Sequence, residues 1–314
     1  MMERYFVNDN NFINSSDAIS IKNLVKFYGN INALNGVDLK VNRGEIYGFL
    51  GPNGAGKTTT IRCMLDLIRP QSGWISVLGL NPQEKSEFIK ARVGYLPGEL
   101  HLDENMTAMQ ILRFFSNLRG NSPDWKFINQ LSERLKLELT TPIRNFSKGN
   151  KQKVGIVASL MNRPELLLLD EPTGGLDPLM QQEVLSMLIE ARNYGATVFL
   201  SSHIISEVQA IADRVAIIRK GKIIKVVETD TLLKRSVRRV RIRFKEDIDT
   251  EELYNLPGVE LIAEDDNLVV SLKYEGEMDD LIKAVAKYPV NDFETEGANL
   301  EEIFLEYYEG QEGN

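Results

Sequence analysis

The sequence predicts an α/β protein in which a parallel sheet flanked by helices is followed by a small C-terminal α+β domain. Two short apolar runs, residues 166–169 and 197–200, have the length and composition of strands that are buried on both faces. Segments with apolar residues at helical spacing accompany these runs, as expected where helices cover a parallel sheet. Beyond about residue 230 the order of strand-like and helix-like segments changes, which indicates a separate domain.

The composition excludes several classes of protein. The 314 residues allow about two domains, and 37 Lys and Arg residues against 45 Asp and Glu residues give a net charge of −8, so we expect no nucleic-acid partner. One cysteine, Cys63, and two histidines, His101 and His203, are too few for a disulfide or a Cys/His zinc site. No apolar run approaches the ~20 residues that span a membrane, and the first residues do not resemble a signal peptide. We therefore expect a cytoplasmic protein.

The N-terminal third divides into an arm, two strands and a strand–loop–helix unit. Residues 1–17 are rich in Asn, Asp and Ser, which predicts a mobile arm. Residues 18–24 and 33–41 read as two strands joined by a turn. Residues 45–50 form a short apolar run that stops at a glycine-rich loop, and residues 58–68 read as a helix.

The glycine-rich loop matches the phosphate-binding pattern G-x-x-x-x-G-K-[ST] in full, between a predicted strand and a predicted helix. Its glycines let backbone N–H groups converge on phosphate oxygens, and the helix that follows adds its positive dipole end. Lys57 supplies a charge for the β- and γ-phosphates, and the Thr58 hydroxyl is placed to bind Mg²⁺. The alternative is a glycine-rich turn with a chance lysine. The predicted nucleotide-binding residues are Gly51, Pro52, Asn53, Gly54, Ala55, Gly56, Lys57, Thr58 and Thr59.

Two acids follow the apolar run 166–169, where a bound Mg²⁺–nucleotide needs them. Asp170 is expected to hold Mg²⁺ through water, and Glu171 to act as general base or to orient the attacking water. The alternative is a solvated acidic pair at the end of a strand. His203 follows a strand expected to lie next to that one, so its imidazole is predicted to contact the γ-phosphate, although a structural histidine is the simpler interpretation. His101 is expected on the surface.

Two further regions complete the predicted domain organisation. Apolar residues recur at helical spacing between residues 105 and 139, which predicts a helical insertion over about residues 100–160 within a main domain of residues 18–229. Residues 230–314 are predicted as the accessory domain. Its expected strands are 237–244, 259–263, 267–272 and 290–294, and its expected helices are 250–255, 278–288 and 299–308.

These motifs, over about residues 19–226, resemble the ATP-binding subunit of an ABC transporter. The segment 26–29 resembles the family's aromatic loop, which implies that Tyr28 stacks on adenine; a half-buried strand tyrosine is the alternative. Residues 146–153 occupy the place of the family signature, with Ser147 and Gly149 matching it and Lys148 and Asn150 departing from it. Asp177 lies in a segment that resembles the D-loop, and His203 resembles the switch histidine.

The resemblance implies a P-loop NTPase sheet with an antiparallel β subdomain and a helical insertion, and ATP with Mg²⁺ as cofactors. Glu171 and His203 are the implied catalytic residues, and Thr58 and Asp170 the implied metal ligands. The signature residues Ser147, Lys148, Gly149 and Asn150 are implied to act on ATP bound by a second ATPase subunit, with a homodimer favoured over a heterodimer. The other implied partner is an integral-membrane permease, which holds the protein at the inner face of the membrane.

Two positions depart from the family pattern. Gly98 stands where the family has a glutamine that binds Mg²⁺ and water, and Glu99 is the nearest substitute. Lys148 places a positive charge where the family usually has no side chain. Lys57, Asp170 and Glu171 are retained, so we still expect ATP hydrolysis.

The C-terminal region gives two weaker indications. Arg239, Arg241 and Arg243 alternate with apolar residues, which predicts an edge strand with a basic outer face that discourages edge pairing. Contact of this face with acidic lipid or an acidic partner is the alternative. Residues 298–305 resemble the tail of drug and antibiotic exporter ATPases, which implies export. The helical insertion is expected to carry the permease-docking groove, with Met106, Met109, Phe114 and Phe115 as candidate lining residues; an internal core is the alternative for most of them.

Two other functions remain open at this point. One is a soluble ABC ATPase that acts on nucleic acid or the ribosome, and the single phosphate loop and lack of a long insertion argue against it. The other is a weakly catalytic regulatory partner in an ABC heterodimer. Glu171 and His203 argue against that role, whereas Gly98 and the altered signature favour it.

Overall fold

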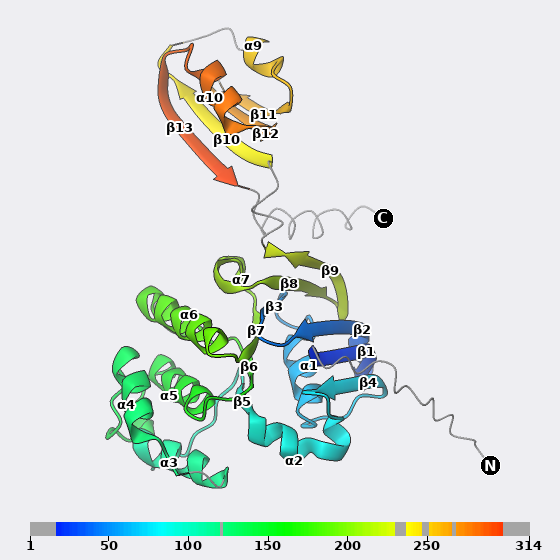
Figure 1. Cartoon of the computed structure of the whole chain (residues 1–314), viewed down its shortest axis with the longest axis vertical. Helices are drawn as coiled ribbons and strands as arrows, with labels where there is room; N and C mark the ends of the chain where they lie inside the picture. The colour runs from blue at the N-terminus through cyan, green and yellow to red at the C-terminus, as the bar shows by residue number, and fades with distance from the viewer. Residues whose placement is uncertain (1–16, 120–121, 230–236, 247–250, 266–267, 298–314) are drawn as a thin grey trace, which may run out of the picture. The chain divides into compact units, whose positions relative to one another are not determined.

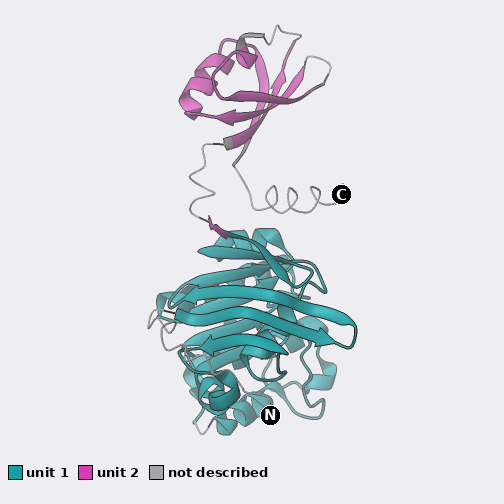
Figure 2. Cartoon of the chain, turned by 90° about the vertical axis from the view of Figure 1, so that its right-hand side faces the viewer, with its two compact units in different colours: residues 1–226 teal, residues 227–314 magenta. Residues whose placement is uncertain are grey.

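The computed structural model describes residues 17–119, 122–229, 237–246, 251–265 and 268–297. The chain forms two compact units, Met1–Val226 and Val227–Asn314, which are coloured separately in Figure 2. The arm expected over residues 1–17 lies outside the described residues, except for Asp17, which begins the first strand. Within the described residues, no helix is long and apolar enough to cross a membrane.

The core of the first unit is a six-stranded sheet with the order β5-β6-β7-β3-β8-β9. Strands β5, β6, β7, β3 and β8 pair in parallel, so the predicted parallel sheet is confirmed. The carboxyl ends of β3, β6 and β7 therefore meet at one edge of the sheet, where α/β proteins bind their ligands. The strands are β3 (Ile46–Leu50), β5 (Val93–Leu96), β6 (Leu166–Asp170), β7 (Thr197–Ser202), β8 (Arg214–Arg219) and β9 (Lys222–Glu228).

A second, antiparallel sheet with the order β2-β1-β4 belongs to the same unit and confirms the predicted antiparallel subdomain. It consists of β1 (Asp17–Tyr28), β2 (Ile31–Asn42) and β4 (Ser72–Val77). Buried residues of both sheets form one hydrophobic cluster, in which Ile19 and Leu34 join Phe49 and Phe199. This shared core fixes the antiparallel sheet against the strand that leads into the phosphate loop.

Helices flank the six-stranded sheet (Figure 1). The predicted helix after the phosphate loop is shorter than expected, because it ends at Met64 and Asp66 then adopts a left-handed conformation with φ 49°. The helical insertion contains α3, which starts with a capping box between Thr107 and Gln110, followed by α4 and α5. The helices are α1 (Lys57–Met64), α2 (Pro82–Arg92), α3 (Ala108–Leu118), α4 (Trp125–Arg134), a 3₁₀ turn (Ile143–Asn145), α5 (Lys148–Leu160), α6 (Pro178–Asn193) and α7 (Ile205–Ile211).

The described residues of the second unit form a four-stranded sheet with the order β11-β12-β10-β13, and two helices. Its core includes Val240, Ile242 and Phe244 from β10, which are almost fully buried. The predicted order of strands and helices is observed up to the last strand, and the final helix expected over 299–308 lies outside the described residues. The elements are β10 (Val237–Phe244), α9 (Glu251–Tyr254), β11 (Val259–Asp265), β12 (Val269–Glu275), α10 (Met278–Val285) and β13 (Val290–Gly297).

The prediction that the arginine-rich strand lies at a sheet edge is wrong. Strand β10 lies between β12 and β13, and its exposed arginines alternate with its buried apolar residues as the sequence suggested. Alternation identifies the solvent-facing side of a strand but carries no information on its lateral neighbours. On β13, Glu294 is paired with Arg241 and Asp292 with Arg243. Opposite charges at paired positions attract, so the row of arginines is balanced by acids and does not form an isolated basic face.

Candidate nucleotide-binding site

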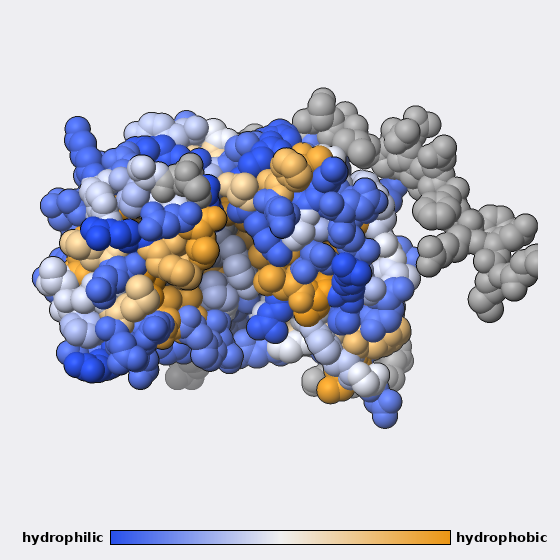
Figure 3. Space-filling model, turned by 90° about the horizontal axis from the view of Figure 1, so that it is seen from below, coloured by the Kyte–Doolittle hydropathy of each residue, from blue (hydrophilic) through white to orange (hydrophobic). Residues whose placement is uncertain are grey.

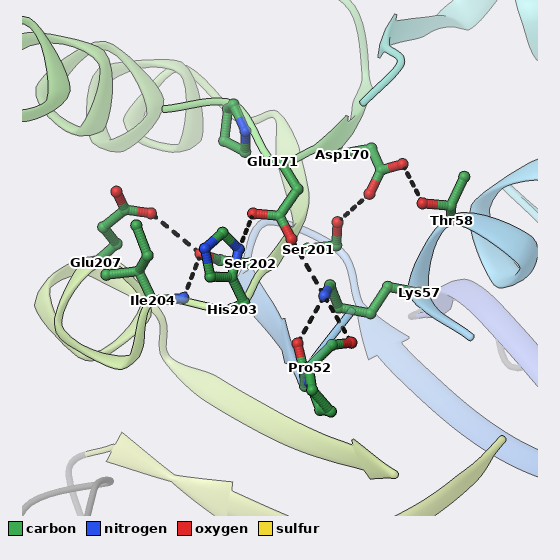
Figure 4. Close-up of polar contacts among 12 residues, drawn as sticks. Pro52, Lys57, Thr58, Asp170, Glu171, Ser201, Ser202, His203, Ile204 and Glu207 are labelled. Atoms are coloured by element: carbon green, nitrogen blue, oxygen red, sulfur yellow. Dashed lines mark hydrogen bonds and ion pairs between the residues drawn. The ribbon is translucent and has the colours of Figure 1, made fainter. Parts of the chain in front are cut away.

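The ends of three parallel strands bring the predicted catalytic residues together (Figure 4). Strand β3 runs into the loop 51–56, after which α1 begins at Lys57. The neighbouring strand β7 ends at Ser202 and is followed by His203, and β6 ends at Asp170 and is followed by Glu171. The three segments are distant in sequence, and the strand order β6-β7-β3 makes them neighbours.

The glycines of the loop have a steric role that the structure makes visible. A Cβ atom on Gly51 would lie 2.4 Å from the carbonyl oxygen of Ile218, and one on Gly56 would lie 2.7 Å from that of Ala33. Gly56 also adopts φ 114°, which residues with side chains rarely adopt. The tight loop is followed at once by the N-terminus of α1, the arrangement that binds phosphate groups in other proteins.

Lys57 is held by the loop that it belongs to. Its ammonium group donates hydrogen bonds to the carbonyl oxygens of Gly51, at 2.6 Å, and Pro52, at 3.2 Å. It also forms an ion pair of 3.1 Å with Oε1 of Glu171, and only 5% of the residue is exposed. A triphosphate in the loop would compete with these oxygen atoms for the same cation.

Glu171 links Lys57 to His203. Its Oε2 lies 2.8 Å from Nδ1 of His203, so the three side chains form one continuous series of polar contacts. Glu171 has φ 54°, a left-handed conformation that costs a residue with a side chain about 1–3 kcal/mol. Hydrogen bonds hold it there, since its N–H donates to Ser201 O and its carbonyl oxygen accepts from Nε2 of Gln152 at 3.0 Å. Such strain is typical of functional sites.

Asp170 is buried, with 1% exposed, and is oriented by two hydroxyl groups. Its Oδ2 accepts a hydrogen bond of 2.6 Å from Oγ1 of Thr58, and its Oδ1 accepts a hydrogen bond from Oγ of Ser201. A carboxylate and a hydroxyl are hard oxygen donors, which suit Mg²⁺. The described residues contain no group of three or more His, Cys, Asp or Glu that could hold a metal ion.

The two departures near the acids lie in different environments. A Cβ on Gly98 would be 3.0 Å from Oδ2 of Asp170, so this glycine lies directly beside the acid. Glu99 is exposed, and its proposed substitution for the missing glutamine stays a prediction.

Tyr28 lies at the exposed end of β1, with Nζ of Lys26 at 5.2 Å from its ring centroid. With 43% of its surface exposed, the ring is free to accept a stacking partner.

The signature and D-loop residues form a second cluster at the starts of α5 and α6. Ser147 caps α5, with its Oγ accepting a hydrogen bond of 3.2 Å from the N–H of Asn150. Asp177 caps α6 by accepting a hydrogen bond from Met180 N. The two helix starts are in contact, because the aliphatic part of the exposed Lys148 side chain lies beside the backbone of Gly175.

Sequence reasoning missed two residues of the site. Ser201 orients Asp170, and Gln152 holds the backbone of Glu171 from α5. Each had a weak signal: Ser201 is a polar residue at the end of an apolar strand, and Gln152 lies one helical turn after the signature glycine. Neither signal identifies its partner, because the partner belongs to another segment of the chain.

Gly149 gives a test of the close contact between the signature and the D-loop. A Cβ atom at Gly149 would lie 2.6 Å from the carbonyl oxygen of Gly175, so one of the two backbones must shift. We expect Gly149→Ala to destabilise the protein by about 1–3 kcal/mol, as overpacking does, and to lower Tm by several degrees in calorimetry. Asn129→Ala, which shortens an exposed side chain of α4 away from this contact, should leave Tm within about one degree. Equal Tm values for both variants would contradict the contact.

The chain is similar to two protein families and to ATP-binding proteins of bacterial transport and drug resistance. The family model described as "ABC transporter" matches residues 34–174, and the model described as "ATP-binding protein DrrA1-3-like, C-terminal domain" matches residues 231–308. The bacitracin transport ATP-binding protein BcrA of Bacillus licheniformis is 38% identical over 224 residues, covering 70% of this chain and 73% of BcrA. The daunorubicin resistance ATP-binding protein DrrA3 of Streptomyces coeruleorubidus is 36% identical over 219 residues, covering 68% of this chain and 69% of DrrA3.

Solved structures give the same assignment. A structure of an ATP-binding subunit of an ABC transporter superposes with a TM-score of 0.64 at 32% identity, covering 68% of this chain and 91% of that one. The dimeric cassette MJ0796 bound to ADP and Pi superposes with a TM-score of 0.62 at 22% identity, covering 67% and 98%, and shows the fold alone. This chain therefore belongs to the ABC transporter family as an ATP-hydrolysing, ATP-binding subunit related to the bacitracin transport and daunorubicin resistance ATP-binding proteins.

Proposed function

We propose that two copies of this chain bind Mg²⁺–ATP in shared sites, hydrolyse it and drive a separately encoded membrane permease, which exports its substrate. The observation that carries the proposal is the continuous series of contacts from Lys57 through Glu171 to His203, beside the pair Thr58–Asp170. This series brings an ammonium group, a carboxylate and an imidazole together beside the phosphate loop, which supports the proposal. These groups favour a catalytic subunit over the weakly catalytic regulatory partner.

In the proposed reaction, the loop 51–56, Lys57 and Thr59 hold the triphosphate, and Tyr28 stacks on adenine. Thr58 and Asp170 are the residues that would hold Mg²⁺, which when bound neutralises charge on the β- and γ-phosphates. Glu171 orients a water molecule and takes its proton as the water oxygen attacks the γ-phosphorus and the bond to the bridging oxygen breaks. His203 keeps the carboxylate of Glu171 in place and is within reach of the γ-phosphate.

The signature residues supply the other half of the site. Ser147 and Lys148 are exposed at the start of α5, where the helix presents its positive end. We propose that this end, including Gly149 and Asn150, faces the γ-phosphate bound by the partner copy, with Asp177 at the same interface. ATP then joins the two copies until its hydrolysis weakens their association.

A pocket on the first unit is a candidate for permease binding. It has a volume of about 250 Å³ and includes Leu65, Leu67, Val93 and Tyr95, with Lys90 and Arg119 as its charged residues. Figure 3 shows apolar side chains on both sides of a hollow in the face carried by α2 and α3. Leu67 lines this pocket and has 49% of its surface exposed, so a partner could contact it directly.

These lining residues differ from the four that the sequence suggested. Phe114 is 48% exposed, whereas Met106, Met109 and Phe115 are partly buried in the helical insertion. None of the four lines the pocket. We propose that the pocket receives a short apolar helix of the permease, which would hold the chain at the inner face of the membrane.

Leu67→Asp is expected to reduce recovery of a co-expressed candidate permease about tenfold or more in affinity purification. The reason is that binding would bury an unpaired carboxylate in an apolar contact. Tyr194→Asp is the matched control, because Tyr194 is 89% exposed and lies outside the pocket. ATP hydrolysis by the isolated chain should be unchanged in both variants. Full recovery of the membrane protein with Leu67→Asp would refute the docking site.

A further inference from the structure

Ser202, the last residue of β7, makes two hydrogen bonds around His203 (Figure 4). Its Oγ accepts a hydrogen bond of 2.9 Å from the N–H of Ile204 and donates one of 3.1 Å to Oε2 of Glu207. Ser202 is fully buried, and Glu207 is 6% exposed. His203 therefore lies between Ser202 and Ile204, which the Ser202 hydroxyl joins, and the buried carboxylate of Glu207 orients that hydroxyl.

The hydrogen bond between Ser202 and Glu207 is a variant of the capping box that often begins a helix. Helix α7 begins at Ile205, its cap residue Ile204 has no capping side chain, and Glu207 is the third helical residue. A glutamate at that position commonly reaches back to the N–H of the cap residue. Here the hydroxyl of Ser202 stands between the two groups. The carboxylate therefore fixes the turn that contains His203 as well as the start of the helix.

Helix α7 is itself fixed to the strand that leads into the phosphate loop. A Cβ on Gly48 of β3 would lie 2.2 Å from Cγ1 of Val208, which is fully buried. Only a glycine allows the helix to approach the strand this closely. Glu207, one residue before Val208, therefore has a rigid position relative to the loop 51–56.

The His203 ring gains little support from packing. The His203 side chain is 51% exposed, and it makes a polar contact with Glu171. A ring that protrudes from a turn takes its direction mainly from the backbone of that turn. The hydrogen bonds of Ser202 define this backbone, so the position of the ring depends on a group that it does not touch.

Burial distinguishes Glu207 from an ordinary helix-start glutamate, which lies in water. Its second oxygen, Oε1, has no hydrogen-bond partner among the described residues. A buried carboxylate with an unpaired oxygen lowers stability and calls for a functional explanation. We propose that Glu207, acting through Ser202, is a positioning residue that holds Nδ1 of His203 on Glu171. The inference rests on the proposed catalytic role of His203.

The test uses the full chain and takes advantage of its two histidines, His101 and His203. In protein labelled with ¹⁵N-histidine, the substitution His101→Gln removes the other histidine, so that all remaining ring signals come from His203. Glu207→Ala and Ser202→Ala should each shift the Nδ1 signal toward that of a ring in water. Glu207→Gln should retain the original signal, because the amide oxygen still accepts from Ser202. An unchanged signal in Glu207→Ala and Ser202→Ala would overturn the inference.

Kinetics supply a second readout. Glu207→Ala and Ser202→Ala should lower kcat for ATP hydrolysis about 10–100-fold, as small displacements of catalytic groups do, with the Kd for ATP changed less than twofold. Glu207→Gln should restore most of the rate. Ser206→Ala is the matched control, because Ser206 is an exposed serine in the same helix start. Equal losses of kcat and ATP affinity would indicate general unfolding and overturn the positioning role.

Two comparisons keep the inference separate from the proposed function. His203→Ala should abolish most hydrolysis; if it does not, the catalytic role of His203 fails whatever Glu207 does. If His203→Ala is inactive and Glu207→Ala is fully active with an unchanged ring signal, only the positioning role fails. Should Glu207→Ala not fold, Ser202→Ala removes the same relay with the loss of a single oxygen atom.

Discussion

Replacing Glu171 with glutamine is expected to lower the rate of ATP hydrolysis about 10²–10⁴-fold, the usual contribution of a general base. Glutamine has nearly the same shape and can still contact Nδ1 of His203, but it cannot accept a proton from water. It also removes the ion pair with Lys57, so the ammonium of Lys57 becomes more available to phosphate. We therefore expect ATP to bind without being cleaved and the two copies to remain joined.

Two measurements check this expectation. Phosphate release gives the rate, and size-exclusion chromatography with Mg²⁺–ATP gives the assembly state, which should be a stable dimer. Glu165→Gln is a suitable control, because Glu165 is a surface carboxylate paired with Arg92 and lies outside the site. A Glu171→Gln variant that stays monomeric with saturating ATP would exclude shared sites, and one that hydrolyses ATP at the normal rate would exclude the general base.

Replacing Lys57 with alanine is expected to weaken ATP binding by roughly 100-fold. Hydrogen bonds to charged groups contribute about 1.5–3 kcal/mol each, and each 1.4 kcal/mol is a factor of ten in Kd. The ammonium group lies within the loop, where it bonds to the carbonyl oxygens of Gly51 and Pro52. Its loss removes the central positive charge of the predicted phosphate cradle. Equilibrium binding of a fluorescent ATP analogue measures the effect.

The same substitution leaves Glu171 without its cation, so stability must be measured in parallel. Lys57→Met keeps much of the side-chain volume and should show the same loss of affinity with a smaller loss of Tm. Lys126→Ala, which removes an exposed lysine of α4, should bind the analogue normally. Tight binding by folded Lys57→Ala protein would refute the assigned cradle.

The sequence predicted the parts of the site that depend on local patterns. The glycine spacing identifies the phosphate-binding motif at residues 51–58. The position of Asp170 and Glu171 directly after an apolar strand identifies these two acids. Parallel strands then bring these segments together, because their carboxyl ends share one edge of the sheet. The predicted sheet and the predicted group of catalytic residues have the same origin, namely strands whose composition marks them as buried on both faces.

Features that depend on which segments become neighbours were not predictable. The arginines of β10 alternate with apolar residues as expected, yet only the sheet order shows that β13 pairs with β10 on the side that the prediction left open. Ser202 and Glu207 each look like ordinary residues of a strand end and a helix start. Their partnership appears only when the turn between them is folded. Likewise, the pocket proposed to bind the permease includes Leu67 and Tyr95, which lie outside the helical insertion, where the sequence suggested the groove.

The contacts of Lys57 have a consequence for how the phosphate loop binds a ligand. Buried cations without a counter-charge destabilise a fold, but this one already has a carboxylate and two carbonyl oxygens around it. Those three oxygen atoms act as an internal substitute for the nucleotide. Ligand binding at this loop is therefore an exchange of partners, because the cation that a phosphate gains is one that the chain's own oxygen atoms lose.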